Sequence, residues 1–221
     1  MKTPAPLHRV VLIILLLGIG PAASAATLLI SDVTVIDPVD GRRSGVDVLI
    51  EDDRIVAIGE APAELPEDAT VLDGDGRYLI PGLWDAHVHL TFFPEIDVET
   101  FARAALRWGV TSLRDTGIPL ERMPEARAAA AGMPAPNLYL AGPLVDGTPR
   151  VYDGAHRFRP AIGVETADVA ASVTMVERIA DAGADLIKAY EMLTPAQFRA
   201  VIETAHARGL IVTAHPPLQL T

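Results

Sequence analysis

The chain has 221 residues, no cysteine and a formal net charge of −11 at pH 7. Without cysteine, disulfides, thiolate metal ligands and a lipoprotein anchor are excluded. The excess of acidic residues argues against nucleic acid or an anionic membrane surface as a partner, because both repel a negatively charged protein. The length suits one medium domain, or a small domain followed by part of a larger one.

Residues 1–25 have the pattern of a secretory signal peptide. Lys2 and Arg9 flank the start of an apolar run at 10–19, and Ala23 and Ala25 supply the small residues of a cleavage site. The run is shorter than the roughly 20 residues of a membrane span, so we expect cleavage and no stable membrane anchor afterwards. Cleavage would place the protein in the periplasm or outside the cell. An uncleaved anchor is the alternative.

Residues 26–80 predict a small β-sandwich or meander. Runs rich in β-branched residues alternate with Asp-Pro, Asp-Gly and acidic turn segments. The segment Asp73-Gly74-Asp75-Gly76 lacks the later ligands of a calcium loop, so it predicts a hairpin turn. The β-rich runs lie at 28–30, 33–36, 46–50 and 55–58.

From residue 81 to residue 221, strands and helices alternate. Each predicted helix ends at a glycine, which supplies the left-handed residue that turns the chain into the next strand. This alternation predicts a parallel sheet, in a doubly wound fold or a barrel. A long loop is expected from 142 to 164. The helices are expected near 98–108, 166–182 and 195–208, and the five strands at 83–90, 110–113, 138–141, 184–190 and 210–214.

Two histidines lie close together in the first of these strands. His87 and His89 are two residues apart, so both imidazoles project from the same face of an extended strand, with Asp85 one step deeper. Imidazole is the commonest metal ligand in proteins, and the pair therefore predicts a metal site. Two unrelated histidines on a half-exposed strand are the alternative.

Lys2 and Lys188 are the only lysines, so Lys188 alone follows the expected signal peptide. A desolvated amine can lose its proton, whereas a guanidinium stays protonated. Lys188 could therefore be a Schiff-base nucleophile, a general base or a carbamate that bridges metal ions. A lysine that reaches solvent from the end of a strand is the alternative. His215 ends the next predicted strand, and barrel active sites are built at such strand ends.

These residues give the chain a resemblance to the amidohydrolase superfamily over residues 28–221. The motifs that carry it are Ile80–His89, Gly109–Asp115, the strand with Lys188 and the strand that ends in His215. The lysine resembles that of the imidazolonepropionase-like and secreted Xaa-Pro dipeptidase-like branch. The resemblance implies a (β/α)8 TIM-type barrel preceded by a small β-domain.

The resemblance also implies a centre with two divalent metal ions, usually zinc. His87 and His89 would hold one ion, His215 would hold the other, and carboxylated Lys188 would bridge them. A metal-activated hydroxide would then hydrolyse the amide, peptide or cyclic-amide C–N bond of a small-molecule or dipeptide-like substrate. Tyr190 and His156 are possible substrate contacts. A packing aromatic and an idle loop residue are their alternatives.

The family pattern needs two further ligands, a histidine after the sixth strand and an aspartate after the eighth. Neither lies in residues 1–221, so we expect a barrel truncated after about five strands, the N-terminal part of a hydrolase. One alternative is a non-catalytic relative. Another is a fragment with no activity of its own that is completed by a partner chain or as a homo-oligomer.

Overall fold

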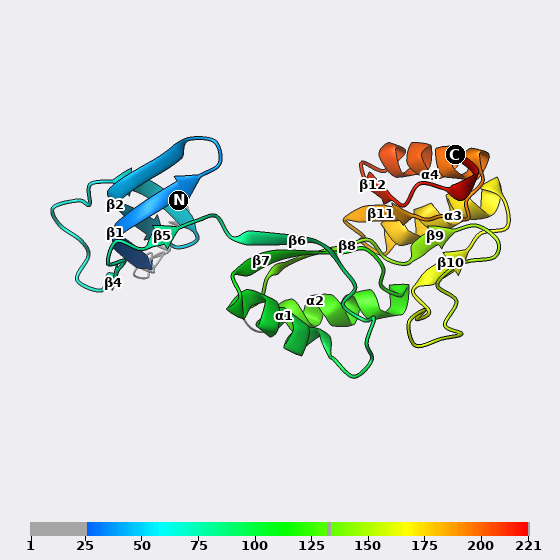
Figure 1. The fold of residues 1–221 in the computed structure, drawn as a ribbon, viewed down its shortest axis with the longest axis horizontal. Coiled ribbons are helices and arrows are strands. Elements are labelled where there is room, and N and C mark those ends of the chain that lie inside the picture. The colour runs from blue at the N-terminus through cyan, green and yellow to red at the C-terminus, as the bar shows by residue number, and fades with distance from the viewer. Residues whose placement is uncertain (1–25, 132–133, 221) are drawn as a thin grey trace, which may run out of the picture. The chain divides into compact units, whose positions relative to one another are not determined.

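The computed structural model describes residues 26–131 and 134–220. Their contacts divide the chain into two compact units, with the boundary between Pro81 and Gly82. Figure 1 shows a β-sheet unit and a unit in which strands and helices alternate. The expected signal peptide lies outside the described residues. No helix in the described ranges combines the length and the apolar character that a membrane crossing requires.

The first unit is one five-stranded sheet built around its first strand. β1 forms antiparallel pairs with β2, which pairs with β3 in the same manner, whereas β4 and β5 both run parallel to β1. Val33, Val35 and Val48 form its buried core. Residues 26–81 contain no second sheet that faces this one. The strands are β1 (Thr27–Asp37), β2 (Gly41–Glu51), β3 (Arg54–Gly59), β4 (Thr70–Asp73) and β5 (Tyr78–Leu79).

The prediction of a hairpin turn at 73–76 is wrong. β4 and β5, which flank this turn, both pair with β1 and not with each other. The turn is held against β1 instead: Gly74 N–H donates to Ser31 O at 2.7 Å, and Gly76 N–H donates to Asp32 O at 2.8 Å. A Cβ atom on Gly74 would lie 2.3 Å from Val33 Cγ1, so the close approach requires glycine there.

Every strand pair of the second unit is parallel, as the alternation of strands and helices predicts. The strands form the sheets β6-β7-β8 and β10-β9-β11-β12. Asp185 N–H, just before β11, donates to Leu140 O in β8 at 2.9 Å and thereby links the two sheets. The strands are β6 (Leu83–Val88), β7 (Val110–Asp115), β8 (Asn137–Leu140), β9 (Leu144–Asp146), β10 (Gly163–Glu165), β11 (Leu186–Ala189) and β12 (Ile211–Ala214).

The segment expected to be a long loop, 142–164, contains β9 and the first residues of β10. Both strands are three residues long, which is too short to show a period in the sequence. Leu144 and Val145 are nevertheless almost fully buried. Residue Val145 pairs with Ala189 of β11, so the loop contributes a strand to the sheet.

Four helices accompany these strands, and local capping explains where they begin. Asp97, Asp168 and Thr194 are N-caps whose side chains accept a backbone N–H from the first turn. The cap at Asp168 starts α3 later than the predicted position 166. Helix α2 was not predicted, because its alanine-rich sequence has no clear apolar stripe. The helices are α1 (Val98–Arg107), α2 (Met123–Ala131), α3 (Val169–Asp181) and α4 (Pro195–Ala207).

The core of the second unit lies between its strands and its helices. Leu140 of β8, Ile179 of α3, Ile187 of β11 and Val201 of α4 are all fully buried in one apolar cluster. Burial of such side chains is the dominant favourable contribution to folding. The same packing fixes the strand ends that carry the candidate site.

We expect Ile187→Ala to lower the free energy of unfolding by about 2–5 kcal/mol, because it leaves a cavity in this core. The matched control is Ile211→Ala on β12, whose side chain is 62% exposed; it should change the free energy by less than about 0.5 kcal/mol. Denaturant unfolding followed by circular dichroism measures both. Equal effects of the two substitutions would contradict this description of the core.

Candidate metal centre

Three histidines and one lysine converge at the carboxyl ends of parallel strands. His87 lies in β6 and His89 follows it, Lys188 lies in β11, and His215 follows β12. The ring centroids of His87 and His89 are 5.3 Å apart, and those of His87 and His215 are 6.1 Å apart. Residues that are distant in the sequence thus meet because the carboxyl ends of these parallel strands lie close together, although β6 belongs to a different sheet from β11 and β12.

His89 is the most deeply enclosed of the three imidazoles. Burial, then the neighbouring His87, Lys188 and His215, lower its pKa to about 4, and the backbone of Gly117 opposes this shift. Its Nδ1 is buried without a hydrogen-bond partner among the described residues. A Cβ atom on Gly117 would lie 3.0 Å from that Nδ1. The ring is therefore neutral at pH 7 and has an uncommitted nitrogen.

Lys188 does not reach solvent, because its side chain is only 2% exposed. Burial is the main cause that lowers the pKa of its amine; Arg114 adds to the effect and Glu191 opposes it. No described side chain pairs with the amine through a hydrogen bond or an ion pair. Burial in an apolar environment disfavours the charged form of an amine. The position of Lys188 is therefore unlike that of a lysine whose amine extends into water.

His215 is held by two neighbours of Lys188. Its Nδ1 lies 3.0 Å from Oε1 of Glu191, and its ring stacks on Tyr190 with centroids 4.7 Å apart. A carboxylate that accepts Nδ1–H fixes the ring orientation and leaves Nε2 free to bind a metal. Sequence reasoning missed Glu191, although an acidic residue three positions after Lys188, beyond the strand end, was a visible signal.

An aromatic wall closes one side of the cluster. We use this term for Phe92, Tyr152 and Tyr190, whose successive ring centroids are 6.3 and 5.6 Å apart. Phe92 also lies 5.8 Å from the His89 ring. Burial, then Tyr152 and Glu191, raises the pKa of Tyr190, so its phenol stays neutral. Tyr190, a predicted site residue, is thus part of the wall and touches His215.

His156 is not brought into this cluster. It lies in an exposed turn between β9 and β10, where its Nδ1 accepts Phe158 N–H at 3.2 Å. Its ring lies 5.5 Å from the ring of Phe158. His156 lines a separate cavity that also includes Phe92.

Two buried aspartates fix the loops around the site, and neither was among the predicted site residues. Asp115, at the end of β7, accepts Leu90 N–H at 2.6 Å and Gly117 N–H at 2.8 Å. Asp146, at the end of β9, accepts N–H groups from Gly147, Val151 and Met192 at 2.8–2.9 Å. Asp115 therefore ties Leu90, the residue after His89, to Gly117, which lies beside the His89 ring. Asp146 ties the rim loop to the segment after Lys188.

The donor atoms of the cluster fit divalent metal ions. Imidazole nitrogens and the oxygens of a carboxylated lysine are ligands that suit zinc. The unpartnered Nδ1 of His89 is consistent with a metal-binding environment. Within the described ranges, no three or more His, Asp or Glu side chains are grouped to hold an ion. The cluster thus offers a histidine pair, one further histidine and Lys188, and does not form a closed cage.

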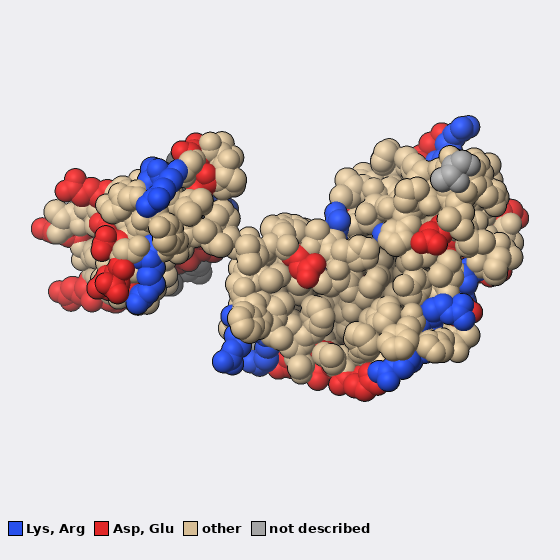
Figure 2. All heavy atoms as spheres, in the orientation of Figure 1, with Lys and Arg blue, Asp and Glu red and all other residues tan. Residues whose placement is uncertain are grey.

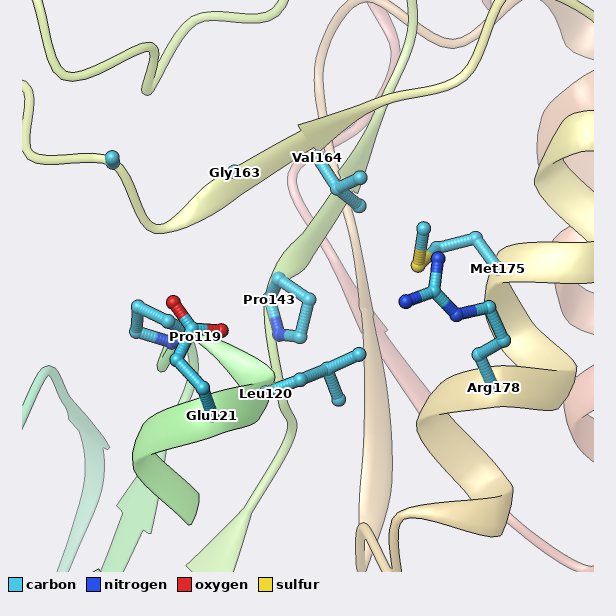
Figure 3. Close-up of a pocket in the computed structure, with 9 residues that line it drawn as sticks. Pro119, Leu120, Glu121, Pro143, Gly163, Val164, Met175 and Arg178 are labelled. Atoms are coloured by element: carbon cyan, nitrogen blue, oxygen red, sulfur yellow. The ribbon is translucent and has the colours of Figure 1, made fainter.

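A cavity of about 250 Å3 lies away from this cluster. Figure 3 shows Glu121 and Arg178 at its sides, with Pro143 and Val164 from the β9–β10 region. None of the predicted site residues lines it. It therefore plays no part in the argument for a metal centre.

Comparison with known proteins decides the family. The pattern of the Amidohydrolase family matches residues 78–218, which carry all the residues of the cluster. The chain belongs to the amidohydrolase family. The dihydroorotase of Syntrophus aciditrophicus is 46% identical over 56 residues, which are 25% of this chain and 13% of that protein. Adenine deaminase 2 of Shouchella clausii is 43% identical over 68 residues, 30% of this chain and 12% of that protein.

Solved amidohydrolase structures share the fold of this chain. A putative prolidase from Bifidobacterium longum superposes with a TM-score of 0.72 and 23% identity, over 89% of this chain and 51% of that one. A prolidase complexed with N-methylphosphonate-L-proline also gives 0.72, with 22% identity, over 86% of this chain and 56% of that one. The chain thus spans about half the length of these structures, and its matches to the curated dihydroorotases span 13–21% of them.

We expect Asp115 to make the free energy of unfolding fall as the pH rises from about 4 to about 6. Burial raises its pKa in the folded protein to about 6, from a usual value of 3.8, so the folded state holds the extra proton in this window. The contribution of Asp115 to the free energy of unfolding is therefore largest below pH 4. About 3 kcal/mol of this contribution is lost as the pH rises to 6.

The measurement compares the metal-free wild-type chain with Asp115→Asn at several pH values. This comparison isolates Asp115, because the lowered pKa of His89 gives the opposite slope in the same window. The stability advantage of the wild type over the variant should shrink as the pH rises. An advantage that is constant across the window would refute the raised pKa.

Proposed function

We propose that this chain is part of a metal-dependent hydrolase that cleaves the C–N bond of amides, peptides or cyclic amides. Its membership of the amidohydrolase family and its similarity to dihydroorotases and prolidases support a hydrolase acting on C–N bonds. The proposal that the hydrolase depends on metal rests on one observation: His87, His89 and His215 lie together with the buried amine of Lys188. This set combines metal-ligand chemistry with a buried amine of lowered pKa at the carboxyl ends of parallel strands.

In this proposal each residue of the cluster has one task. His87 and His89 would hold one ion, and Nε2 of His215 would hold the second. The amine of Lys188 would take up carbon dioxide, with an N–C bond formed and one proton released, and the carbamate would supply oxygen ligands to the ions. Bound divalent ions, zinc by the chemistry of these donors, supply Lewis acidity and lower the pKa of water.

Other residues position these groups or shield them. Glu191 orients His215, and Asp115 ties the residue after His89 to Gly117. The aromatic wall keeps water away from one side of the site and would face the apolar part of a small-molecule or dipeptide-like substrate. The neutral phenol of Tyr190 can donate a hydrogen bond to a substrate carbonyl. His156 would contact substrate only through the separate cavity that it lines.

We also propose that the parallel strands of the second unit are the first strands of a (β/α)8 barrel, preceded by the small β-domain at 26–80. Exposed apolar side chains on the edge strands β6 and β12 favour this proposal. Trp84 of β6 is 57% exposed although it stacks on Tyr139 of β8 at 4.8 Å, and Ile211 of β12 is also exposed. Further strands, from the same or another chain, would cover these apolar groups and supply the remaining ligands.

The proposed setting is extracytoplasmic. It depends on the signal-peptide pattern of residues 1–25, with release from the membrane after cleavage. Figure 2 shows that acidic side chains predominate on the visible face of the β-sheet unit. This charge agrees with the expectation that nucleic acid is not a partner. Self-association into a homo-oligomer stays a proposal.

We expect Lys188→Ala to lose bound zinc, because removal of the amine removes the bridging carbamate. Protein loaded with zinc in bicarbonate and then dialysed is assayed for metal by mass spectrometry, and for hydrolysis of Xaa-Pro dipeptides and dihydroorotate. Short carboxylic acids should restore part of the metal content of this variant. Lys188→Arg should be no better than Lys188→Ala, because a guanidinium cannot form the carbamate.

Arg103→Ala on the exposed face of α1 is the matched control for this experiment and should keep the wild-type metal content. Full metal content in Lys188→Ala would refute the bridging role. A wild-type chain that binds zinc without hydrolysing any member of the panel would favour the non-catalytic or partner-completed alternative.

We expect Glu191→Leu to weaken zinc binding by about 10–100-fold, the usual effect of removing a carboxylate that orients a metal-binding histidine. Nitrogen-15 NMR of the metal-free protein gives a second readout, because it reports which nitrogen of His215 carries the proton. In the wild type this should be Nδ1, and in Glu191→Leu the proton should shift towards Nε2. Glu191→Gln, which keeps an acceptor oxygen, should preserve Nδ1–H, as should the exposed control Glu203→Leu. An unchanged His215 signal in Glu191→Leu would contradict the role of Glu191.

A further inference from the structure

Asp146, at the end of β9, is a buried carboxylate to which the proposed function assigns no task. The residue is 1% exposed, and no lysine or arginine in the described ranges forms an ion pair with it. Burial raises the pKa of its carboxyl, and the N–H groups of Val151, Met192 and Gly147 oppose this shift. A carboxylate is costly to bury unless hydrogen bonds compensate. The role of Asp146 therefore lies in the backbone groups that it binds.

The two oxygens of this carboxylate bind two different loops. Oδ1 accepts Gly147 N–H at 2.9 Å and Met192 N–H at 2.8 Å, and Oδ2 accepts Val151 N–H at 2.8 Å. Met192 lies in the loop between β11 and α4, whereas Val151 lies in the rim loop, which joins β9 to β10. The strands β9 and β11 are neighbours in one sheet (Figure 1), so a side chain at the end of β9 reaches both loops.

Both loops carry side chains of the candidate site. The rim loop carries Tyr152, and the loop between β11 and α4 carries Tyr190 and Glu191. The rings of the two tyrosines are 5.6 Å apart, and a hydrogen bond joins their side chains. Oε1 of Glu191 lies 3.0 Å from Nδ1 of His215. Each loop is thus bound by Asp146 one residue away from a side chain of the site.

The main chain around Asp146 has little freedom to move. A Cβ atom on Gly147 would lie 2.0 Å from Met192 O, so only glycine allows β9 to end this close to the neighbouring loop. The carbonyl of Asp146 accepts both the N–H and the Oγ1–H of Thr166 at 2.8 Å. Thr166 O in turn accepts Nε2–H of Gln197, at the start of α4, at 2.8 Å. The carboxylate is therefore a fixed point between the two loops.

We propose that Asp146 is a positioning residue that couples the two loops of the candidate site. Through Oδ2 it holds Tyr152 in the aromatic wall, and through Oδ1 it holds the loop from which Glu191 orients His215. A neutral amide has one acceptor oxygen and cannot serve both loops, which is why a carboxylate is buried here. The importance of this coupling for catalysis rests on the proposed function; the coupling itself does not.

Asp146→Asn should release the rim loop alone. The amide oxygen should stay at the Oδ1 position, where two N–H groups donate, so the amide nitrogen would face Val151 N–H and that bond would be lost. Hydrogen exchange followed by NMR in the metal-free chain should become about tenfold faster at Val151, since a hydrogen bond to a charged group contributes that much. Nuclear Overhauser effects between the rings of Tyr152 and Tyr190 should weaken, while His215 keeps its proton on Nδ1.

Gly147→Ala should disturb the other loop alone, because its Cβ would overlap Met192 O. Displacement of this loop moves Glu191 away from His215. In nitrogen-15 NMR of the metal-free chain, the His215 proton should therefore shift from Nδ1 towards Nε2. Exchange at Val151 should stay close to that of the wild type.

Ser172→Ala is the matched control. Ser172 is fully buried, and its hydroxyl donates to Oγ1 of Thr166 at 2.9 Å. The substitution therefore also removes a buried hydrogen bond, although it touches neither loop. It should lower the midpoint of denaturant unfolding, and it should leave both the His215 signal and the exchange at Val151, relative to the amides of β11, as in the wild type.

Asp146→Ala removes both oxygens and should show both changes together. Unchanged exchange at Val151 in Asp146→Asn, an unchanged His215 signal in both Gly147→Ala and Asp146→Ala, or the same changes in the control as in the other variants would overturn the proposal. The last result would mean that Asp146 only stabilises the fold. Because no metal is present, these outcomes are independent of whether the chain binds zinc or hydrolyses C–N bonds.

Discussion

The candidate site depends on the burial of one amine. Lys188 lies in β11 with almost no exposed surface, and its amine has no hydrogen bond or ion pair with a described side chain. Such a group is costly to bury in its charged form, so burial lowers the pKa of the amine. The neighbouring histidines experience the same environment, which lowers the pKa values of His87 and His89. The lowered pKa values of Lys188, His87 and His89 therefore have one main cause in common, the burial of these side chains.

Several features could be predicted from the sequence because each has a local cause. The spacing of His87 and His89 in a strand, the glycines that end helices, and the cap at Thr194 all depend on a few adjacent residues. The parallel pairing followed from the alternation of strands and helices. Lys188 could be singled out because, after the expected signal peptide, the chain has arginine and not lysine at its other permanently basic positions. For residues at the carboxyl ends of parallel strands, such as Lys188 and His215, the order of strands and helices in the sequence was enough to predict that they lie at the same edge of the sheet.

Other features could not be predicted, because they arise from contacts between distant segments. The strands β9 and β10 are three residues long, and β9 becomes recognisable only when Val145 pairs with Ala189. The roles of Asp115 and Asp146 depend on backbone N–H groups that are not adjacent in the sequence, such as Leu90 and Met192. Glu191 was visible as an acid, but its partner His215 is 24 residues away. The supporting contacts of the site are thus mainly tertiary.

The two halves of the candidate site have different folding requirements. Lys188, Tyr190, Glu191 and His215 all belong to one strand–helix–strand unit, β11-α4-β12, in which the two strands pair directly. Such local contacts cost little chain entropy and form readily. His87, in contrast, contacts His215 across 128 residues of the sequence. The entropy of chain closure therefore makes the contacts around His215 less costly to form than the contact between the histidine pair and His215.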